Sequence, residues 1–470
     1  MKVKMILPAL TEAKSPYWRP IKYSLFPPLG LALLAGYLSD EDQVVIQDEH
    51  VERLNLSDRP DLVAIEAYVT SAYRVYELAD FYRARGAYVC LGGLHVTTRP
   101  QEASLHADSI FCGPAEATWP AFLRDFAQGH PAPRYQSSQR SLANIPPLRR
   151  DLIKSNRYLV PNSLVVSRGC PHACDFCYKE SFFRGGKPFY TQQVDRVLKE
   201  IDALPGRHLF FLDDNLFADR RFALSLFEGL EGMGRLWQAA GTVSAAQDDE
   251  LLNRAAASGL KSLFIGFETL NGDNLRQQHK FQNLGRDYDD VVRRLHDRGV
   301  MINASFVFGM DADSPSVFDS TAEWAIAQGI ETATFHILTP YPGTRLHKRM
   351  EAEGRILTHN WNLYDTRHCV YQPRNMTAQQ LEDGYRRAYD TFYKWSSIFR
   401  SARVKPDTLS ALRHLAYTGG WKKFEFVWGL LIKTGLVSRT RPLLERVLAG
   451  TGPLRRAHLA HACRGQPAPT

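Results

Sequence analysis

The sequence lacks any uninterrupted apolar run long enough to cross a membrane. The longest purely apolar stretch near the C-terminus is 426–432, whereas a membrane-spanning helix needs about 20 residues. Residues 1–10 have neither the long apolar segment nor the small-residue cleavage site of a signal peptide, and their pattern predicts a first strand. We therefore expect a cytoplasmic protein whose only membrane association would be peripheral.

Cysteine is scarce, with seven residues in a chain of 470. The total is odd and four of the seven are scattered, so the disulfide framework of a small secreted domain is not indicated. The other three, Cys170, Cys174 and Cys177, lie within eight residues of one another. Thiols clustered in this way in a reducing compartment indicate a metal site.

Most of the chain also lacks an excess of positive charge. Residues 400–470 contain 13 Lys and Arg against 3 Asp and Glu, whereas the other residues contain 45 against 47. The body is thus nearly neutral, and we expect no nucleic-acid partner. The basic tail has two interpretations, a contact with an anionic membrane surface or a solvated helical face, and the second is the simpler one.

Short β-type runs alternate with helical runs over the first 140 residues, which is typical of a parallel, doubly wound sheet. Strands are predicted at 3–7, 43–47, 61–66, 88–92 and 109–112, and helices at 30–39, 73–85, 102–106 and 119–128. Ligands of such sheets bind beyond the carboxyl ends of the strands. The loops that follow the strands are therefore candidate binding loops, and they contain Thr70, Ser71, Gly92, Gly93 and Gly113.

A second block of βα repeats follows a polar, proline-rich stretch at 129–150 that predicts a linker. Strands are predicted at 164–167, 209–212, 263–267, 302–308 and 332–337, and helices at 191–203, 221–233, 248–258, 288–298 and 316–327. This repetition predicts a whole or partial α/β barrel. We divide the chain into a Rossmann-like domain at 1–135, a linker at 136–160, a barrel at 161–355 and a helical C-terminal extension at 356–470, frayed after residue 451.

The three clustered cysteines directly follow a predicted strand and have the spacing C-x-x-x-C-x-x-C. Thiolates at this spacing can bind one face of a cubane iron–sulfur cluster. Because no fourth cysteine is near in sequence, one iron would keep an open coordination site, as a substrate-activating cluster requires. The alternative is a structural zinc site, which would need a fourth ligand from His172 or from a distant residue.

The cysteine loop resembles the signature of the radical S-adenosylmethionine (SAM) superfamily, in which an aromatic residue, here Phe176, precedes the last cysteine. The resemblance implies that Cys170, Cys174 and Cys177 hold a [4Fe–4S] cluster. It implies that SAM binds the open iron and is cleaved reductively to a 5′-deoxyadenosyl radical, with Phe176 against the adenine. It also implies a reductant such as flavodoxin or ferredoxin.

Two further segments resemble SAM-binding turns of the superfamily. Asp213, Asp214 and Asn215 stand where many members have Gly-Gly-Glu, and their oxygen atoms can accept hydrogen bonds from an ammonium group. Taken alone, the same three residues would be interpreted as a turn or helix cap. Gly266 and Glu268 resemble a Gly-x-Glu-Thr turn, in which Glu268 either contacts SAM or braces the sheet; both interpretations stay open.

Segments of the N-terminal domain resemble the cobalamin-binding domain of one radical SAM class. They include Gly92 and Gly93, and Gly113 with Glu116, where glycine would let the backbone approach a large flat ligand. The Asp-x-His-x-x-Gly motif that supplies a cobalt ligand in mutases is missing after the first strand, and we do not assign His50 to that role. The resemblance implies cobalamin without a protein histidine below the metal; a Rossmann-like domain without a cofactor is the alternative.

The C-terminal extension contains aromatic residues at helical spacing, Tyr385, Tyr389 and Phe392, which predicts that they are part of a core. Asp365 and His368 precede them in a segment that we interpret as a lid over the active site. No catalytic acid or base is predicted from this region.

Taken together, the resemblance implies an enzyme that methylates an unactivated carbon of a small molecule, and a polycyclic lipid or tetrapyrrole would suit the basic tail. Cobalamin-assisted cyclisation or rearrangement without methyl transfer is the first alternative. An iron–sulfur module that leaves SAM intact is the second. Transfer-RNA methylthiolation is disfavoured, because that family has three further cluster cysteines in its N-terminal domain, where only Cys90 and Cys112 occur here.

Overall fold

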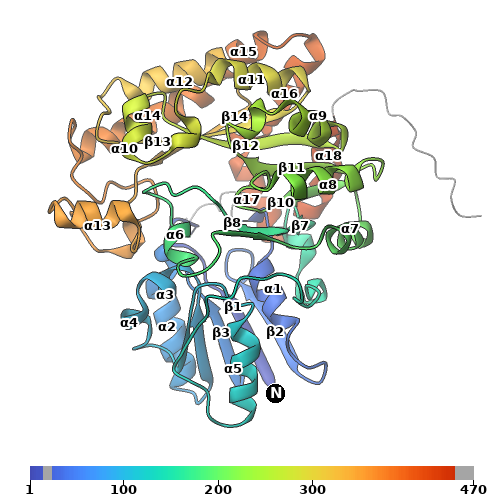
Figure 1. Ribbon diagram of the computed structural model, residues 1–470, viewed down its shortest axis with the longest axis vertical. Helices are drawn as coiled ribbons and strands as arrows, with labels where there is room; N and C mark the ends of the chain where they lie inside the picture. The colour runs from blue at the N-terminus through green and yellow to red at the C-terminus, as the bar shows by residue number, and fades with distance from the viewer. Residues whose placement is uncertain (14–23, 450–470) are drawn as a thin grey trace, which may run out of the picture.

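The computed structural model describes residues 1–13 and 24–449. The predicted frayed end and the last part of the basic tail, including Cys463, lie outside the described residues. Two six-stranded parallel sheets form the two halves of the molecule, with the N-terminal half in blue and cyan and the second half in green and yellow in Figure 1. No helix in the described ranges is both long and apolar enough to span a bilayer.

The first sheet has the strand order β2-β1-β3-β4-β5-β6, and all of its pairs are parallel. Its strands are β1 (Lys2–Leu7), β2 (Gln43–Asp48), β3 (Leu62–Glu66), β4 (Tyr88–Gly92), β5 (Ser109–Cys112) and β6 (Arg134–Gln136). This is the doubly wound arrangement that the sequence predicts, with the order reversing beside β1. The polar stretch at 129–150, which predicts a linker, contains the strand β6, and this strand forms the edge of the sheet beside β5.

Helices cover both faces of this sheet. They are α1 (Leu29–Ala35), α2 (Ala72–Arg83), α3 (Leu94–Thr98), α4 (Pro100–Ala103) and α5 (Thr118–Ala127). Side chains of α1 and α5 pack on one face, against Met5 and Ala64, while side chains of α2 and α3 pack on the other, against Ile65 and Leu91. Burial on both faces is usual for parallel sheets and explains the continuous apolar runs of their strands.

The second sheet has the order β14-β13-β12-β11-β10-β7 and is also entirely parallel. Its strands are β7 (Ser163–Leu164), β10 (His208–Phe211), β11 (Leu236–Gly241), β12 (Leu260–Glu268), β13 (Met301–Phe308) and β14 (Thr332–Ile337). The strand β14 does not pair with β7, so the sheet is an open, partial barrel. The predicted strand at 164–167 is divided between β7 and β8 (Ser167–Gly169), which pairs antiparallel with β9 (Phe189–Thr191).

The two faces of the second sheet differ in polarity. On one face, side chains such as Leu263, Ile302 and Phe335 join a large core with the surrounding helices. The helices along this part of the chain are α7 (Val194–Ala203), α8 (Arg220–Leu230), α9 (Asp249–Ala257), α10 (Gly272–Gln277), α11 (Tyr288–Asp297) and α12 (Val317–Ala327). The alternate residues on the inner face include Asn303 and Thr334. Closed α/β barrels fill their interior with branched apolar side chains, so this polar inner face indicates a lumen for a ligand.

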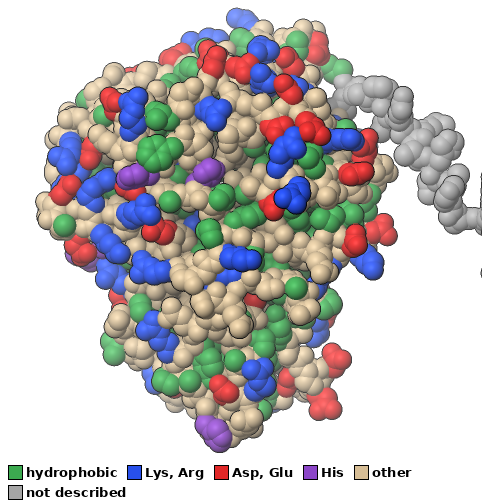
Figure 2. All heavy atoms as spheres, in the orientation of Figure 1, with side chains coloured by type: hydrophobic (Ala, Val, Ile, Leu, Met, Phe, Trp, Pro, Cys, Tyr) green, Lys and Arg blue, Asp and Glu red, His purple; other side chains and the backbone are tan. Residues whose placement is uncertain are grey.

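The C-terminal extension joins the two halves and closes one end of the partial barrel. The helix α13 (Arg345–Ala352) ends the preceding barrel segment, and the helices of the extension are α14 (Ala378–Tyr393), α15 (Trp395–Arg403), α16 (Thr408–Lys422), α17 (Glu425–Thr434) and α18 (Arg441–Ala449). Phe392 is buried in the core, and Tyr385 and Tyr389 pack against it, as their spacing predicts. The segment around Trp361 packs into the core of the N-terminal half. On the face shown in Figure 2, acidic and basic side chains are interspersed.

Candidate functional site

The cysteine loop lies between β8 and the short helix α6 (Lys179–Phe182), at the end of the barrel that faces the N-terminal half (Figure 1). Gly169 begins the loop with a left-handed backbone, φ 82°. A Cβ atom at this position would collide with the carbonyl oxygen of Pro188, to which Cys170 N–H donates a hydrogen bond of 2.9 Å. Only glycine fits here, and the close strand contact fixes where the first cysteine stands.

The three predicted cluster ligands come together at this loop, with Cys174 buried and Cys170 and Cys177 half-buried. Side-chain amides approach two of the sulfurs. Asn215 Nδ2 lies 4.0 Å from Cys170 Sγ, and Gln282 Nε2 lies 3.4 Å from Cys174 Sγ. Hydrogen bonds to cysteine sulfur are one of the means by which a protein tunes an iron–sulfur cluster. Gln282 carried no recognisable motif in the sequence.

Of the three residues after β10 that the sequence singles out, two hold the loop in place. Asp213 accepts hydrogen bonds from the backbone N–H of Val166 and from the backbone and hydroxyl of Ser167. Burial raises the pKa of Asp213 to about 7, although these hydrogen bonds oppose the shift. Asp214 accepts from Gly169 N–H at 3.0 Å and forms an ion pair with Lys179 at 2.6 Å.

Asn215 differs from its two neighbours. The residue is 3% exposed, and its Oδ1 atom has no hydrogen-bond partner among the described residues. A buried acceptor without a donor costs free energy unless a ligand supplies one. The Oδ1 atom is therefore an acceptor that a ligand beside Cys170 could use.

The other predicted SAM turn lies on the opposite side of the cysteine loop. Glu268 has φ 66°, a left-handed conformation that is uncommon outside glycine, and the β12–β13 register shifts beside it. Its carboxylate forms a 2.6 Å ion pair with Lys280, and the two side chains are about nine-tenths buried. Lys280 Nζ also lies 6.0 Å from the centre of the Phe176 ring.

Lys280 brings positive charge to the cysteine loop. Burial opposes its charged form, but Glu268 and the nearby Cys174 outweigh burial and raise the pKa of Lys280. The ammonium group is therefore charged and available to a carboxylate. No sequence pattern predicts this residue, because it stands in a turn after α10 that carries no motif.

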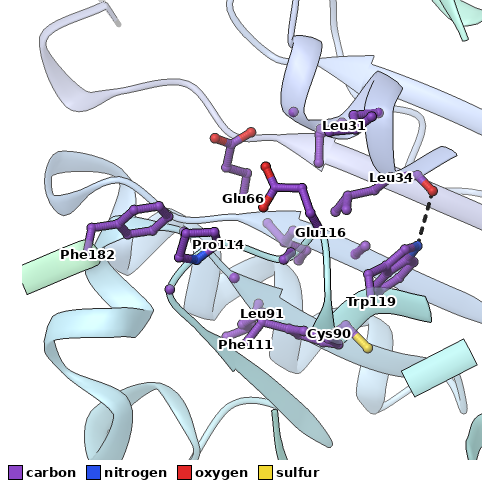
Figure 3. Close-up of a pocket in the computed structure, with 18 of the residues that line it drawn as sticks. Leu31, Leu34, Glu66, Cys90, Leu91, Phe111, Pro114, Glu116, Trp119 and Phe182 are labelled. Atoms are coloured by element: carbon purple, nitrogen blue, oxygen red, sulfur yellow. Dashed lines mark hydrogen bonds between the residues drawn. The ribbon is translucent and has the colours of Figure 1, made fainter. Parts of the chain in front are cut away.

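A cavity enclosing about 750 Å³ of empty space, part of it open to solvent, lies at the carboxyl ends of β3, β4 and β5 (Figure 3). Phe182 and Trp119 stand at opposite ends of it in this view. Its walls combine small residues and apolar side chains with two carboxylates; they include Gly30, Leu31, Leu34, Glu66, Leu91, Gly92, Gly93, Phe111, Gly113, Ala115 and Glu116. The predicted Gly92, Gly93, Gly113 and Glu116 thus meet at one cavity.

Two predicted loop residues and one histidine lie outside the lining of that cavity. Thr70 and Ser71 are buried in a short 3-10 helix, where Thr70 O accepts a hydrogen bond from Thr11 and Ser71 Oγ bonds Tyr68 N–H. His50 Nδ1 lies 2.7 Å from Asp48 Oδ1, and its Nε2 accepts from Leu10 N–H. Both ring nitrogens of His50 therefore have partners within the N-terminal half.

The barrel also contributes to the walls of this cavity. Arg168, in β8, and Phe182, in α6, line it, and Arg168 forms a 3.0 Å ion pair with Glu116. Arg168 Nε is buried without a partner among the described residues. The cavity is thus an apolar slot with glycine backbone on one side, and within the described residues the Nε donor of Arg168 is left for a ligand. These features fit a large, flat cofactor with a phosphate-bearing tail, such as cobalamin.

Comparison with known proteins supports the same assignment for both halves. Residues 164–325 match the Radical SAM superfamily, residues 23–123 match the B12 binding domain, and residues 344–461 match a domain of unknown function (DUF4070). The chain is 30% identical to bacteriochlorophyllide d C-12(1)-methyltransferase of Chlorobaculum tepidum, over 81% of this chain and 85% of that protein. The chain belongs to the radical SAM enzymes that carry a B12-binding domain. Its cofactors are accordingly a [4Fe–4S] cluster, SAM and cobalamin.

Two other similarities are consistent with membership of this family. Hopanoid C-2 methylase of Rhodopseudomonas palustris is 23% identical over 71% of this chain and 66% of its own length. The radical SAM methyltransferase TsrM of Kitasatospora setae, solved with cobalamin and a [4Fe–4S] cluster bound, superposes with a TM-score of 0.63 at 14% identity. That superposition covers 95% of this chain and all of TsrM, so this radical SAM enzyme shares the overall fold.

Proposed function

We propose that this radical SAM enzyme methylates an unactivated carbon of a large, mainly apolar small molecule of the tetrapyrrole or polycyclic-lipid kind. Support for methyl transfer comes from relatives named for that activity, which act on bacteriochlorophyllide d and on hopanoids. Both are large, polycyclic and mostly apolar. Cyclisation without methyl transfer is the alternative that the experiment below must exclude.

The observation that carries this proposal is the wall shared by the two cofactor sites. Arg168 lies two residues before Cys170, Phe182 lies five residues after Cys177, and both line the cavity of the N-terminal half. The segment that bears the cysteines therefore separates the cavity from the barrel lumen. The methyl donor and the radical source would then lie on the two sides of this short segment. That arrangement suits transfer of a methyl group to a substrate held between them.

Residue roles follow from the contacts described above. Cys170, Cys174 and Cys177 would hold the cluster, which with SAM supplies the radical that removes a substrate hydrogen, while cobalamin supplies the methyl group. Asn215 Oδ1 would accept a hydrogen bond from the SAM ammonium group. Lys280 would pair with the SAM carboxylate, with Glu268 fixing its position.

Two further partners belong to this proposal. A flavodoxin or ferredoxin would supply the electron that the cluster requires. A peripheral membrane contact is supported by apolar side chains on the basic C-terminal helices, since Phe424, Leu430 and Leu443 are 48%, 62% and 65% exposed. Exposed apolar side chains beside Lys and Arg are typical of helices that lie on an anionic bilayer.

The decisive experiment is anaerobic reconstitution with iron, sulfide and hydroxocobalamin, followed by turnover with SAM labelled in its methyl group, dithionite and candidate polycyclic substrates. We expect bound corrin near one equivalent, 5′-deoxyadenosine and a product that carries the label. The variant Cys174→Ala should lose the cluster and 5′-deoxyadenosine together. A dehydrogenated or cyclised product without the label would refute methyl transfer and favour the alternative.

A second measurement addresses the SAM contacts. Replacing Asn215 by Ala removes one buried acceptor for a charged donor, so the dissociation constant of SAM should rise about tenfold. Iron content should not change, because Asn215 is not a proposed ligand. Equilibrium dialysis of the reconstituted protein with labelled SAM measures the effect, and unchanged affinity would remove Asn215 from the SAM site.

A further inference from the structure

A second cavity lies at the end of the partial barrel opposite the cysteine loop. It encloses about 1210 Å³ of empty space, part of it continuous with solvent. The inner face of the second sheet near the strand starts forms one wall, and the C-terminal helices α16, α17 and α18 form the other. Residues 25–26 and 159–160 complete the lining. The open barrel is thus not filled at this end but capped by the extension.

Most side chains around this cavity are apolar or aromatic. Phe26, Trp421 and Trp428 line it, together with Phe264, which is 36% exposed although it belongs to a central strand. A large aromatic side chain left uncovered inside a protein indicates space that a ligand fills. Leu443 also lines the cavity and is 65% exposed, which locates an opening to the surface at α18.

One polar side chain in the lining has an unsatisfied atom. His208, at the start of β10, is 7% exposed, and its Nε2 has no hydrogen-bond partner within the described part of the chain. Burial lowers the pKa of His208 to about 4, so the imidazole is neutral near pH 7 and can donate or accept one hydrogen bond. An unpaired buried nitrogen is costly unless a ligand completes it.

The inner face of the sheet leads from this cavity toward the proposed SAM site. Phe264 and Thr334 line the cavity, and Gly266 and His336 follow them on the same face, two residues or about 7 Å further along each strand. Gly266 lies beside Glu268 and Lys280. A molecule that fills the cavity and extends along this face therefore reaches the residues proposed to bind SAM.

We propose that this cavity holds the apolar part of the substrate, with one polar group of that part hydrogen-bonded to His208 Nε2. The inference rests on the proposed function, because it assumes a large apolar substrate. The apolar and aromatic lining of this space suits a polycyclic or long-chain portion. The position of the cavity on the same sheet face as the SAM site favours a part of the substrate over a separate lipid of the same chemistry.

The test uses the reconstituted holoenzyme and 1-pyrenemethanol, a polycyclic alcohol that accepts excitation energy from tryptophan. Trp421 and Trp428 line the cavity, so saturable quenching with one probe per chain is expected. Gly420 lines the cavity, and a Cβ atom there would meet no heavy atom within 4 Å. The variant Gly420→Phe should bind the probe at least about tenfold more weakly than the matched control Gly420→Ala, because its ring occupies the space.

The contribution of His208 is tested with 1-methylpyrene, which lacks the hydroxyl group. Wild-type enzyme should prefer 1-pyrenemethanol by about fivefold, and His208→Phe should bind both probes equally. Circular dichroism and iron content must match the wild type in each variant. Equal probe affinity in Gly420→Phe and Gly420→Ala, or a preference retained in His208→Phe, would overturn the proposal.

Perdeuterated alkan-1-ols from decan-1-ol to octadecan-1-ol distinguish a substrate part from a separate lipid. Deuterium in 5′-deoxyadenosine after reduction would show that a chain held in the cavity reaches the SAM site. Displacement of 1-pyrenemethanol without deuterium at any chain length would assign the cavity to a separate lipid. Because the probe titrations need no turnover, they can succeed or fail independently of the methyl-transfer test.

Discussion

Gly169 and Gly185 have almost the same left-handed backbone, with φ 82° and 79°, but different surroundings. A Cβ atom on Gly169 would collide with Pro188 O, whereas a Cβ atom on Gly185 would meet no heavy atom within 4 Å. The two alanine variants therefore separate backbone strain from steric collision. Gly185→Ala should cost about 1–2 kcal/mol, while Gly169→Ala should also displace the strand that begins the cysteine loop.

We expect Gly169→Ala to lose most of its iron on reconstitution and Gly185→Ala to retain it. Iron and sulfide analysis after gel filtration, with thermal unfolding of both variants, checks this. Full iron content in Gly169→Ala would show that the loop adapts and that the contact with Pro188 does not position Cys170.

At the same scale, the sequence predicted the residues that form local motifs and missed those that meet only in the folded chain. The spacing of the cysteines and the aromatic residue before Cys177 are readable because neighbouring positions act together. Lys280 and Gln282 approach Cys174 from more than 100 residues away. No local pattern marks them. The oxygens of Asp213, which was predicted to contact SAM, accept hydrogen bonds from the backbone of Val166 and Ser167.

Among the elements, α15 and α16 are attached to the barrel by a buried charge cluster. Glu331, just before β14, pairs with Lys405 in the turn between the two helices, and both side chains are 5% exposed. Burial would raise the pKa of Glu331, but Lys405 and His296 outweigh burial and hold it well below its usual value. The pair thus favours the docked helices wherever Glu331 is ionised.

Glu331→Gln leaves Lys405 buried without a counter-charge and should weaken this docking by about 3–5 kcal/mol. The exposed pair of Glu323 in α12 with Arg400 in α15 provides the control, and Glu323→Gln should cost at most about 1 kcal/mol. Hydrogen exchange of α15 and α16, read by mass spectrometry, measures both. Similar exchange in the two variants would contradict a special contribution from Glu331.

The same pair predicts a pH dependence with a defined sign. Because the folded-state pKa of Glu331 is lowered, its contribution is present above the unfolded value of about 4.3 and is lost as the pH falls through the folded value. The difference in protection between wild type and Glu331→Gln should therefore be full at neutral pH and shrink only below about pH 4. If this difference in protection had already disappeared at pH 5 as the pH falls, the titrating group would be a histidine and not Glu331.

Elements were predictable where apolar periodicity was strong. The strands β4, β5 and β14 begin and end where the pattern predicts. The strand β11 was missed, because its segment combines alanine, glutamine and glycine and has little β propensity of its own. Pairing with β10 and β12 and the burial of Trp237 make it a strand. The polar β6 was missed for a related reason, since an edge strand needs little apolar surface.

Across the whole molecule, two cavities lie at opposite ends of the barrel strands, and one glycine in each offers a matched test. Gly30 lines the cavity of the N-terminal half, and a Cβ atom there would have only the Glu66 carboxylate as a neighbour, at 3.6 Å. Gly420 has the corresponding place in the second cavity. Both glycines stand in helices with ordinary backbone geometry, so phenylalanine can be accommodated at either site only by occupying the cavity.

The variant Gly30→Phe should lower bound corrin at least about tenfold after reconstitution, because its ring would fill space that a large flat ligand needs. Gly30→Ala should retain corrin. Iron content should match the wild type in both, and binding of 1-pyrenemethanol should not change, since that probe is expected in the other cavity. Gly420→Phe should show the reverse, with normal corrin and weakened probe binding.

Two outcomes would contradict this arrangement. If both phenylalanine variants lost both ligands, the cavities would not be independent, and the shared loss would point to a global change of the fold. If Gly30→Phe bound a full equivalent of corrin, cobalamin would lie elsewhere on the N-terminal half.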